Sequence, residues 1–247
     1  MNPTKNAVPP LSVLSAAFIL LIFGLSGGVT RLFGAPTPTA EMLKWEKLVA
    51  NKLKIPPPPE GAVLCIGSSH MALWKSIQTD LAPLHVYNYG IGGSKMSHAA
   101  ELFVPNFVIP FKPRAVILYE GSNDLNSNQT PEEILVHFRR LYRQIHEALP
   151  QTRLYVLGIV PSPGKRFDRW DAIKETNSLI KQECKENPWI KFLDTTTPLI
   201  TQKGMPRPEC FLENDIHMNE TGYEVWKSVV APVVVPAESP FEVPDQR

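Results

Sequence analysis

The sequence predicts an α/β protein, a three-layer α/β/α sandwich built around a five-stranded parallel sheet. Three observations lead to this fold class. Five short apolar runs of strand length follow one another along the chain. Segments with the apolar spacing of helices separate them. The first run, 62–66, ends at Gly67 and passes into a segment that can start a helix, as chains do at the carboxyl edge of a parallel sheet.

The predicted strands are apolar runs bounded by turn-forming residues, and they span 62–66, 86–89, 115–119, 154–160 and 190–193. The predicted helices span 70–76, 97–107, 130–149, 169–186 and 220–230. The helix over 130–149 has the clearest start, because Thr130 is a favoured cap, Pro131 suits the first helical position and two acids follow. Strands that alternate with helices in this way indicate a parallel sheet covered on both faces.

Residues 1–34 predict a membrane anchor or a signal segment. Residues 11–29 carry no charge, and about 20 apolar residues can span a bilayer. A cleaved signal peptide is the alternative, because Ser26-Gly27-Gly28 could serve as its cleavage site. We favour an uncleaved anchor, which predicts a membrane-anchored chain facing outside the cytoplasm. Cleavage of residues 1 to about 28 would make the protein secreted or periplasmic.

The rest of the chain divides into three parts. Residues 35–60 predict a linker with a short helix over 40–54, followed by a stiff proline spacer. Residues 61–231 contain all five predicted strands and form the predicted domain. The tail 232–247 is rich in proline and acidic residues, and we expect it to be frayed.

Composition narrows the classes of function. The 247 residues, 43% of them hydrophobic, suffice for one domain with a sizeable core. A formal net charge of +1 gives no broad electrostatic case for nucleic-acid binding. The cysteines Cys65, Cys184 and Cys210 lack CxxC spacing, so we expect neither a metal site nor a disulfide framework.

The stretch 62–74 organises the predicted site. Ser69 stands where the first strand turns into a helix, whose start offers unpaired N–H groups and the positive end of the helix dipole. A serine hydroxyl at this place is well positioned to act as a nucleophile. Serine is also a favoured N-cap residue, and the motif alone is more typical of a plain cap.

Three further positions favour the nucleophile over the cap. Gly93 follows the second strand and Asn123 follows the third, so both reach the same edge of the sheet as Ser69. His217 lies just before the last predicted helix. A hydrolytic serine site needs a nucleophile, a base and donors for an oxyanion, and these are the residue types present.

With these motifs in this order along the chain, the sequence resembles the SGNH hydrolases, also called GDSL-like lipases and acylhydrolases, over about residues 60–230. Within that family it resembles the bacterial branch that is similar to platelet-activating-factor acetylhydrolase. The matching blocks are Ile66-Gly67-Ser68-Ser69, Asn88 to Gly93, Gly121-Ser122-Asn123-Asp124, and the segment that ends at His217. In the first block, Ser68 replaces the Asp of the family's Gly-Asp-Ser.

The resemblance implies a flavodoxin-like sheet, the SGNH hydrolase fold. It implies that Ser69 is the nucleophile and His217 the base, with no metal and no organic cofactor. It further implies an oxyanion hole formed by the N–H groups of Ser69 and Gly93 and the side-chain amide of Asn123.

The sequence departs from the family beside the predicted base. The family has Asp three residues before the histidine, whereas this chain has Asn214 there and Asp215 one residue later. Asn214 could orient His217 through its amide oxygen without adding charge. A local shift could instead bring Asp215 to the histidine, and a backbone carbonyl could also orient it. The sequence leaves these alternatives open.

We therefore expect a serine esterase that cleaves short-chain esters of a small molecule or a glycan. One alternative is a membrane-tethered binding protein that has lost turnover, which the Asn214 departure motivates. Another is acyl transfer to a polysaccharide by the same residues. Arg166 and Arg169 follow the fourth strand and are interpreted as ordinary surface residues rather than as pocket residues.

Overall fold

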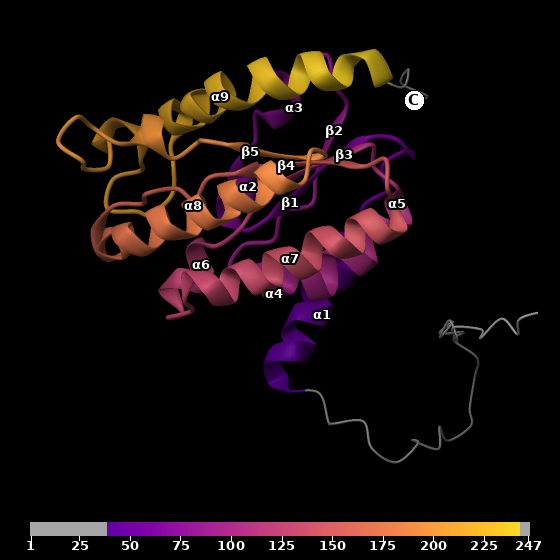
Figure 1. Ribbon diagram of the computed structural model, residues 1–247, viewed down its shortest axis with the longest axis horizontal. Helices are drawn as coiled ribbons and strands as arrows, with labels where there is room; N and C mark the ends of the chain where they lie inside the picture. The colour runs from indigo at the N-terminus through magenta and orange to yellow at the C-terminus, as the bar shows by residue number, and fades with distance from the viewer. Residues whose placement is uncertain (1–38, 243–247) are drawn as a thin grey trace, which may run out of the picture. The chain divides into compact units, whose positions relative to one another are not determined.

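A five-stranded parallel sheet lies at the centre of the fold (Figure 1). The computed structural model describes residues 39–242. Its strands are β1 (Val63–Gly67), β2 (Val86–Asn88), β3 (Ala115–Tyr119), β4 (Arg153–Leu157) and β5 (Ile190–Leu193). They are arranged in the order β2-β1-β3-β4-β5, and every neighbouring pair is parallel. This flavodoxin-like order confirms the predicted fold class.

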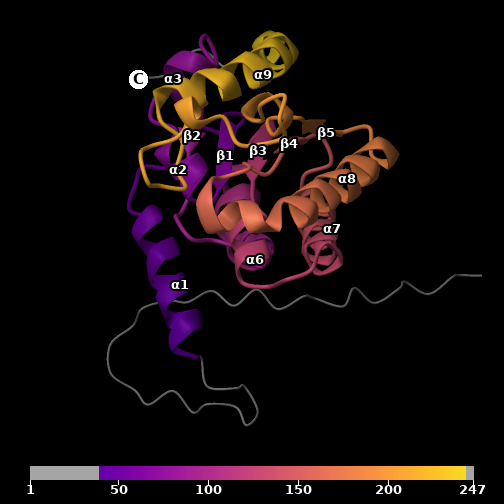
Figure 2. The same cartoon turned by 90° about the vertical axis from the view of Figure 1, so that its left-hand side faces the viewer.

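Helices cover both faces of the sheet, as Figure 2 shows. One face packs against α2 (Ser69–Leu73), α3 (Ile77–Asp80) and α9 (Glu220–Glu238). The other packs against α7 (Pro131–Ala148), α8 (Trp170–Glu186) and the continuous segment α4 (Met96–His98), η1 (Ala99–Val108) and α5 (Ile109–Phe111). Because side chains alternate along a strand, Val63 and Cys65 face the first layer, while Leu64 and Ile66 face the second.

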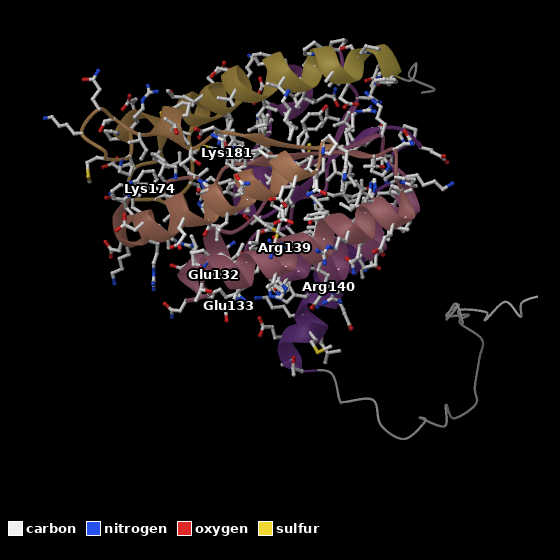
Figure 3. All side chains as sticks on the ribbon, in the orientation of Figure 1. Glu132, Glu133, Arg139, Arg140, Lys174 and Lys181 are labelled. Carbon is white, nitrogen blue, oxygen red and sulfur yellow. The ribbon has the colours of Figure 1, made fainter. Side chains whose placement is uncertain are left out.

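The helix α7 begins as its sequence predicts. The Thr130 hydroxyl accepts a hydrogen bond from the Glu133 N–H at 3.3 Å, and the Glu133 carboxylate accepts one from the Thr130 N–H at 2.8 Å. This capping box, with Pro131 at the first position, stabilises the helix by about 1 kcal/mol. Glu132, Glu133 and Arg140 lie on the solvent side of α7 (Figure 3).

The segment 96–111 is longer than the helix predicted over 97–107, and its middle is a π-helix. Pro105 lies inside it and has no N–H to donate. The Asn106 side-chain amide donates to the Leu102 carbonyl at 2.8 Å and so satisfies one acceptor of the widened turn.

The prediction of a frayed tail from Pro232 is wrong for the residues up to Glu238, because α9 continues to that residue. Pro232 and Pro236 lie on its exposed face, where water can solvate the carbonyls left without a donor. The side chains of Val234 and Glu238 are buried, and their burial stabilises the last turns of α9 against the domain. The Glu238 carboxylate accepts two hydrogen bonds from Arg153, each 2.6 Å long.

The predicted membrane location is also corrected. In the part of the chain that the structure describes, no helix is long and apolar enough to cross a bilayer. The segment 11–29, on which that prediction depended, lies outside the described residues. The helix expected in the linker is α1 (Ala40–Lys52), and it packs on the domain through the buried side chains of Trp45 and Val49.

Candidate active site

The segments that directly follow β1, β2 and β3 carry Ser69, Gly93 and Asn123 at one edge of the sheet. These three strands are neighbours in the order β2-β1-β3, so the segments that follow them lie side by side. The loop before α9 adds His217. The structure thus brings together the residues that the sequence analysis selected from four separate segments.

A chain of hydrogen bonds joins the side chains of Ser69, His217 and Asp215. The Oγ atom of Ser69 lies 3.0 Å from Nε2 of His217. On the other side of the ring, Nδ1 of His217 lies 2.8 Å from Oδ1 of Asp215. Because a carboxylate only accepts hydrogen bonds, Nδ1 carries the proton and Nε2 is left free to accept the serine proton.

Asp215, and not Asn214, contacts the imidazole of His217. Oδ1 of Asp215 also accepts the backbone N–H groups of His217 at 3.1 Å and Ile216 at 2.6 Å. The hydrogen bond from the His217 N–H is the main cause that lowers the pKa of Asp215 below its usual value. Asn214 has a φ of +55°, which turns the chain so that the next residue faces the histidine.

The backbone around Ser69 is shaped by a close approach of two strands. Gly67 has a φ of +143°, and a Cβ atom there would lie 2.1 Å from the Tyr119 carbonyl oxygen. Only glycine fits this position. The N–H of Ser68 donates to that same carbonyl at 3.0 Å, and Ser69 then opens α2 as its first residue. Its N–H therefore has no acceptor within the helix.

Gly93 lies in an exposed turn after β2 with a φ of +82°, and apart from its two chain neighbours no described residue comes within 4 Å of the place a Cβ would occupy. Its N–H makes no hydrogen bond to any of residues 39–242. The neighbouring Gly92 approaches the nucleophile, because a Cβ there would lie 3.8 Å from Cβ of Ser69. The turn is therefore open beside Ser69, with a free backbone donor.

The side-chain amide of Asn123 is held from both ends. Its Nδ2 donates to the Ser94 carbonyl at 2.9 Å, and its Oδ1 accepts from Nη2 of Arg166 at 3.2 Å. Nη1 of Arg166 also donates to the Ser122 carbonyl at 2.9 Å. One N–H of the amide remains for a ligand. The interpretation of Arg166 as an ordinary surface residue is thus wrong, because this half-buried side chain fixes a site residue.

Two buried acids lie behind the turn that carries Gly93. Glu120 is 2% exposed, and its Oε1 accepts a hydrogen bond from the Ser94 hydroxyl at 2.5 Å, while its Oε2 has no hydrogen-bond partner within the described part of the chain. Asp124 is fully buried and accepts the Met96 N–H at 2.9 Å. Burial raises the pKa of Glu120 well above its usual value and that of Asp124 to about 6.

We expect Glu120→Gln to stabilise the protein at neutral pH. The folded chain retains protons on these acids above the ordinary carboxyl pKa of about 4, whereas the unfolded chain releases them. The free energy of unfolding therefore falls as the pH rises from about 4 past 6. The glutamine keeps an acceptor for Ser94 and cannot ionise, so that fall should be shallower and the Tm at pH 8 about 2–4 °C higher.

Thermal unfolding between pH 4 and pH 8 measures this difference. Glu147→Gln is the matched control, because it makes the same chemical change at an exposed acid on α7. If Glu120→Gln and Glu147→Gln gave the same pH profile as the unsubstituted protein, Glu120 would not be the buried acid that sets the profile.

A cleft of about 700 Å³ lies beside the loop that carries Asp215. Two segments line it, residues 163–165 after β4 and the stretch between Pro208 and Ile216. Half of the ten lining residues have apolar side chains, namely Pro163, Pro208, Phe211, Leu212 and Ile216. Among residues 39–242, no group of three or more His, Cys, Asp and Glu side chains could hold a metal ion.

The chain is similar in sequence and in fold to known proteins. The chain is 23% identical over 197 residues to the human platelet-activating factor acetylhydrolase IB subunit alpha1, covering 76% of this chain and 83% of that protein. A GDSL-like lipase from Bacteroides thetaiotaomicron superposes with a TM-score of 0.64 at 16% identity, covering 78% of this chain and 98% of the lipase. An acetyl esterase, solved as a mutant with acetate ion, superposes with a TM-score of 0.58 at 14% identity, covering 73% and 99% of the two chains.

The model of one protein family also matches the chain. Its match runs over residues 65–225, which takes in the end of β1, the whole of β2 to β5 and each of the site segments. The chain belongs to the GDSL-like lipase/acylhydrolase family.

Proposed function

We propose that this protein is a serine esterase that cleaves short-chain esters. In the proposed reaction, Ser69 Oγ attacks the ester carbonyl while Nε2 of His217 takes its proton. The tetrahedral oxyanion accepts hydrogen bonds from the N–H groups of Ser69 and Gly93 and from the Asn123 amide. His217 then protonates the departing alcohol, and the same ring activates the water that releases the acyl group from Ser69.

The observation that carries the proposal is the continuous hydrogen-bond chain Ser69–His217–Asp215, with steps of 3.0 and 2.8 Å. It supplies a base within reach of the nucleophile and a carboxylate that stabilises the imidazolium. The alternative of a binding protein without turnover depended on Asn214 replacing the family's Asp. It is less well supported, because Asp215 supplies a carboxylate to His217 instead. A short acyl group is supported by the names of the similar proteins, an acetylhydrolase and an acetyl esterase.

Covalent labelling tests the proposal directly. The protein is treated with a fluorophosphonate, which reacts with activated serines, and the adduct is located by peptide mass spectrometry. We expect one adduct on Ser69, its loss in Ser69→Ala, and hydrolysis of 4-nitrophenyl acetate faster than of the octanoate. A folded protein without an adduct on Ser69 would refute the proposal, and a preference for the octanoate would refute the short-chain part alone.

A further inference from the structure

The residue directly after the candidate nucleophile is a buried histidine. His70 is 2% exposed and lies on α2. The centroid of its ring is 5.3 Å from those of Tyr119 and His217, and 6.3 Å from that of Trp226. Burial lowers the pKa of His70 to about 3, so the ring is neutral at neutral pH. A buried neutral imidazole must place its one N–H on an acceptor.

The acceptor is the backbone of the loop that carries the candidate base. Nε2 of His70 lies 3.2 Å from the Ile216 carbonyl oxygen. Because a carbonyl can only accept, this nitrogen carries the proton. The N–H of the same residue, Ile216, donates to Asp215 Oδ1 at 2.6 Å. Ile216 is thus held at its N–H by Asp215 and at its carbonyl by His70.

The helix that presents Ser69 is fixed in turn by α9. The Tyr223 hydroxyl donates to the His70 carbonyl at 2.9 Å, so His70 is hydrogen-bonded through both its side chain and its backbone. Ser69 and His70, the residue that contacts the loop carrying His217, are joined by a single peptide bond. A displacement of that loop by 1 Å would move His217 out of hydrogen-bonding reach of Ser69 Oγ.

We infer that His70 is a positioning residue, which holds the Asp215–His217 segment in register with Ser69 through the hydrogen bond from its Nε2 to the Ile216 carbonyl. The inference rests on the proposed serine esterase function. It assigns to His70 no contact with the substrate and no proton transfer. Its effect should therefore appear in kcat and in the rate of serine labelling, with little change in KM.

Three substitutions of His70 test the hydrogen bond. His70→Gln places an amide N–H the same number of bonds from Cα as Nε2, whereas the amide of His70→Asn is one bond shorter and His70→Leu has no donor. We expect kcat to fall about 10- to 100-fold in His70→Leu and His70→Asn, and less than about fivefold in His70→Gln. KM should stay within about twofold in all three. Each is assayed at least 15 °C below its own Tm, and Glu147→Gln serves as the unaffected control.

The outcomes separate this inference from the proposed function. If the unsubstituted protein acquires no fluorophosphonate adduct, both fail. If Ser69 is labelled but His70→Asn and His70→Gln lose activity equally, the inference fails and the esterase stands. If His70→Leu does not fold, the comparison of His70→Gln with His70→Asn still tests the inference. Nitrogen NMR of the imidazoles gives a readout independent of activity: we expect a protonated Nε2 on His70 from pH 5 to pH 8, and a ring that titrates in this range would overturn the inference.

Discussion

Replacement of Asp215 by Asn should lower kcat about 100- to 10,000-fold while leaving KM nearly unchanged. The carboxylate holds Nδ1 of His217 at 2.8 Å and selects the tautomer whose Nε2 can accept the serine proton. An asparagine that presents its amide N–H would favour the opposite tautomer. It would also remove the negative charge that stabilises the imidazolium formed in the transition state.

The exposure of Asp215 sets where in this range the effect should lie. Its side chain is 43% exposed and that of His217 is 23% exposed, so water screens part of their charge interaction. The tautomer and the orientation of the ring do not depend on screening. We therefore expect the loss to lie nearer 100- than 10,000-fold, measured with 4-nitrophenyl acetate under saturating conditions and checked against the rate of Ser69 labelling.

Asn214 supplies the matched control, because it is the neighbour that occupies the family's acidic position. Asn214→Asp and Asn214→Gly should each leave kcat within about threefold, since both residues tolerate the φ of +55° and no hydrogen bond of the Asn214 side chain to His217 is present in the described part of the chain. A rise in kcat on Asn214→Asp together with an unaffected Asp215→Asn would show that Asn214 holds the orienting position, contrary to the geometry.

The difference between Asn214 and Asp215 shows what a sequence can and cannot predict about this site. Ser69, Asn123 and His217 were found because each follows a strand or precedes a helix, and topology alone brings such positions together. The choice between two adjacent residues depends on one backbone dihedral, the φ of +55° at Asn214. Asparagine is one of the few residues that adopt this conformation readily, which is the one signal the sequence offered.

The fold was predictable to a similar degree. The flavodoxin-like sheet order was expected only from the family resemblance, whereas the alternation of strands and helices and the start of α7 follow from local patterns of apolar residues and caps. The end of α9 does not follow from such patterns. Pro232 and Pro236 indicate a break in the helix, but α9 continues to Glu238, which is buried and paired with Arg153. Those partners are 85 residues apart in sequence, and no local pattern encodes such a contact.

The residues that support the site were missed for the same reason. Arg166 is recognisable only once the loop after β4 is placed over Asn123. His70 was visible beside Ser69, but its partner, the Ile216 carbonyl, is a backbone group 146 residues away. A polar residue inside an apolar stretch such as 62–74 is the signal that could have identified it, since a buried polar group needs a partner.

Removal of the Asn123 amide should produce the other large loss. We expect Asn123→Ala to lower kcat about 100- to 1,000-fold, the range found when one side-chain donor of an oxyanion hole is deleted. The amide is preorganised, because Ser94 holds its nitrogen end at 2.9 Å and Arg166 its oxygen end at 3.2 Å. A donor fixed in this way needs no reorganisation when charge develops on the carbonyl oxygen, so its loss should appear in kcat and leave KM nearly unchanged.

Two further variants distinguish a donor to the oxyanion from a structural role. Asn126→Ala deletes the same amide from an exposed position of the same short helix, α6 (Ser122–Asn126), and should leave kcat unchanged. Asn123→Asp keeps an acceptor for Arg166 but brings a negative charge to the place where the oxyanion forms, so it should be at least as inactive as Asn123→Ala. Activity of Asn123→Asp close to that of the unsubstituted protein would mean that the side chain only anchors Arg166. The oxyanion would then depend on the N–H groups of Ser69 and Gly93 alone.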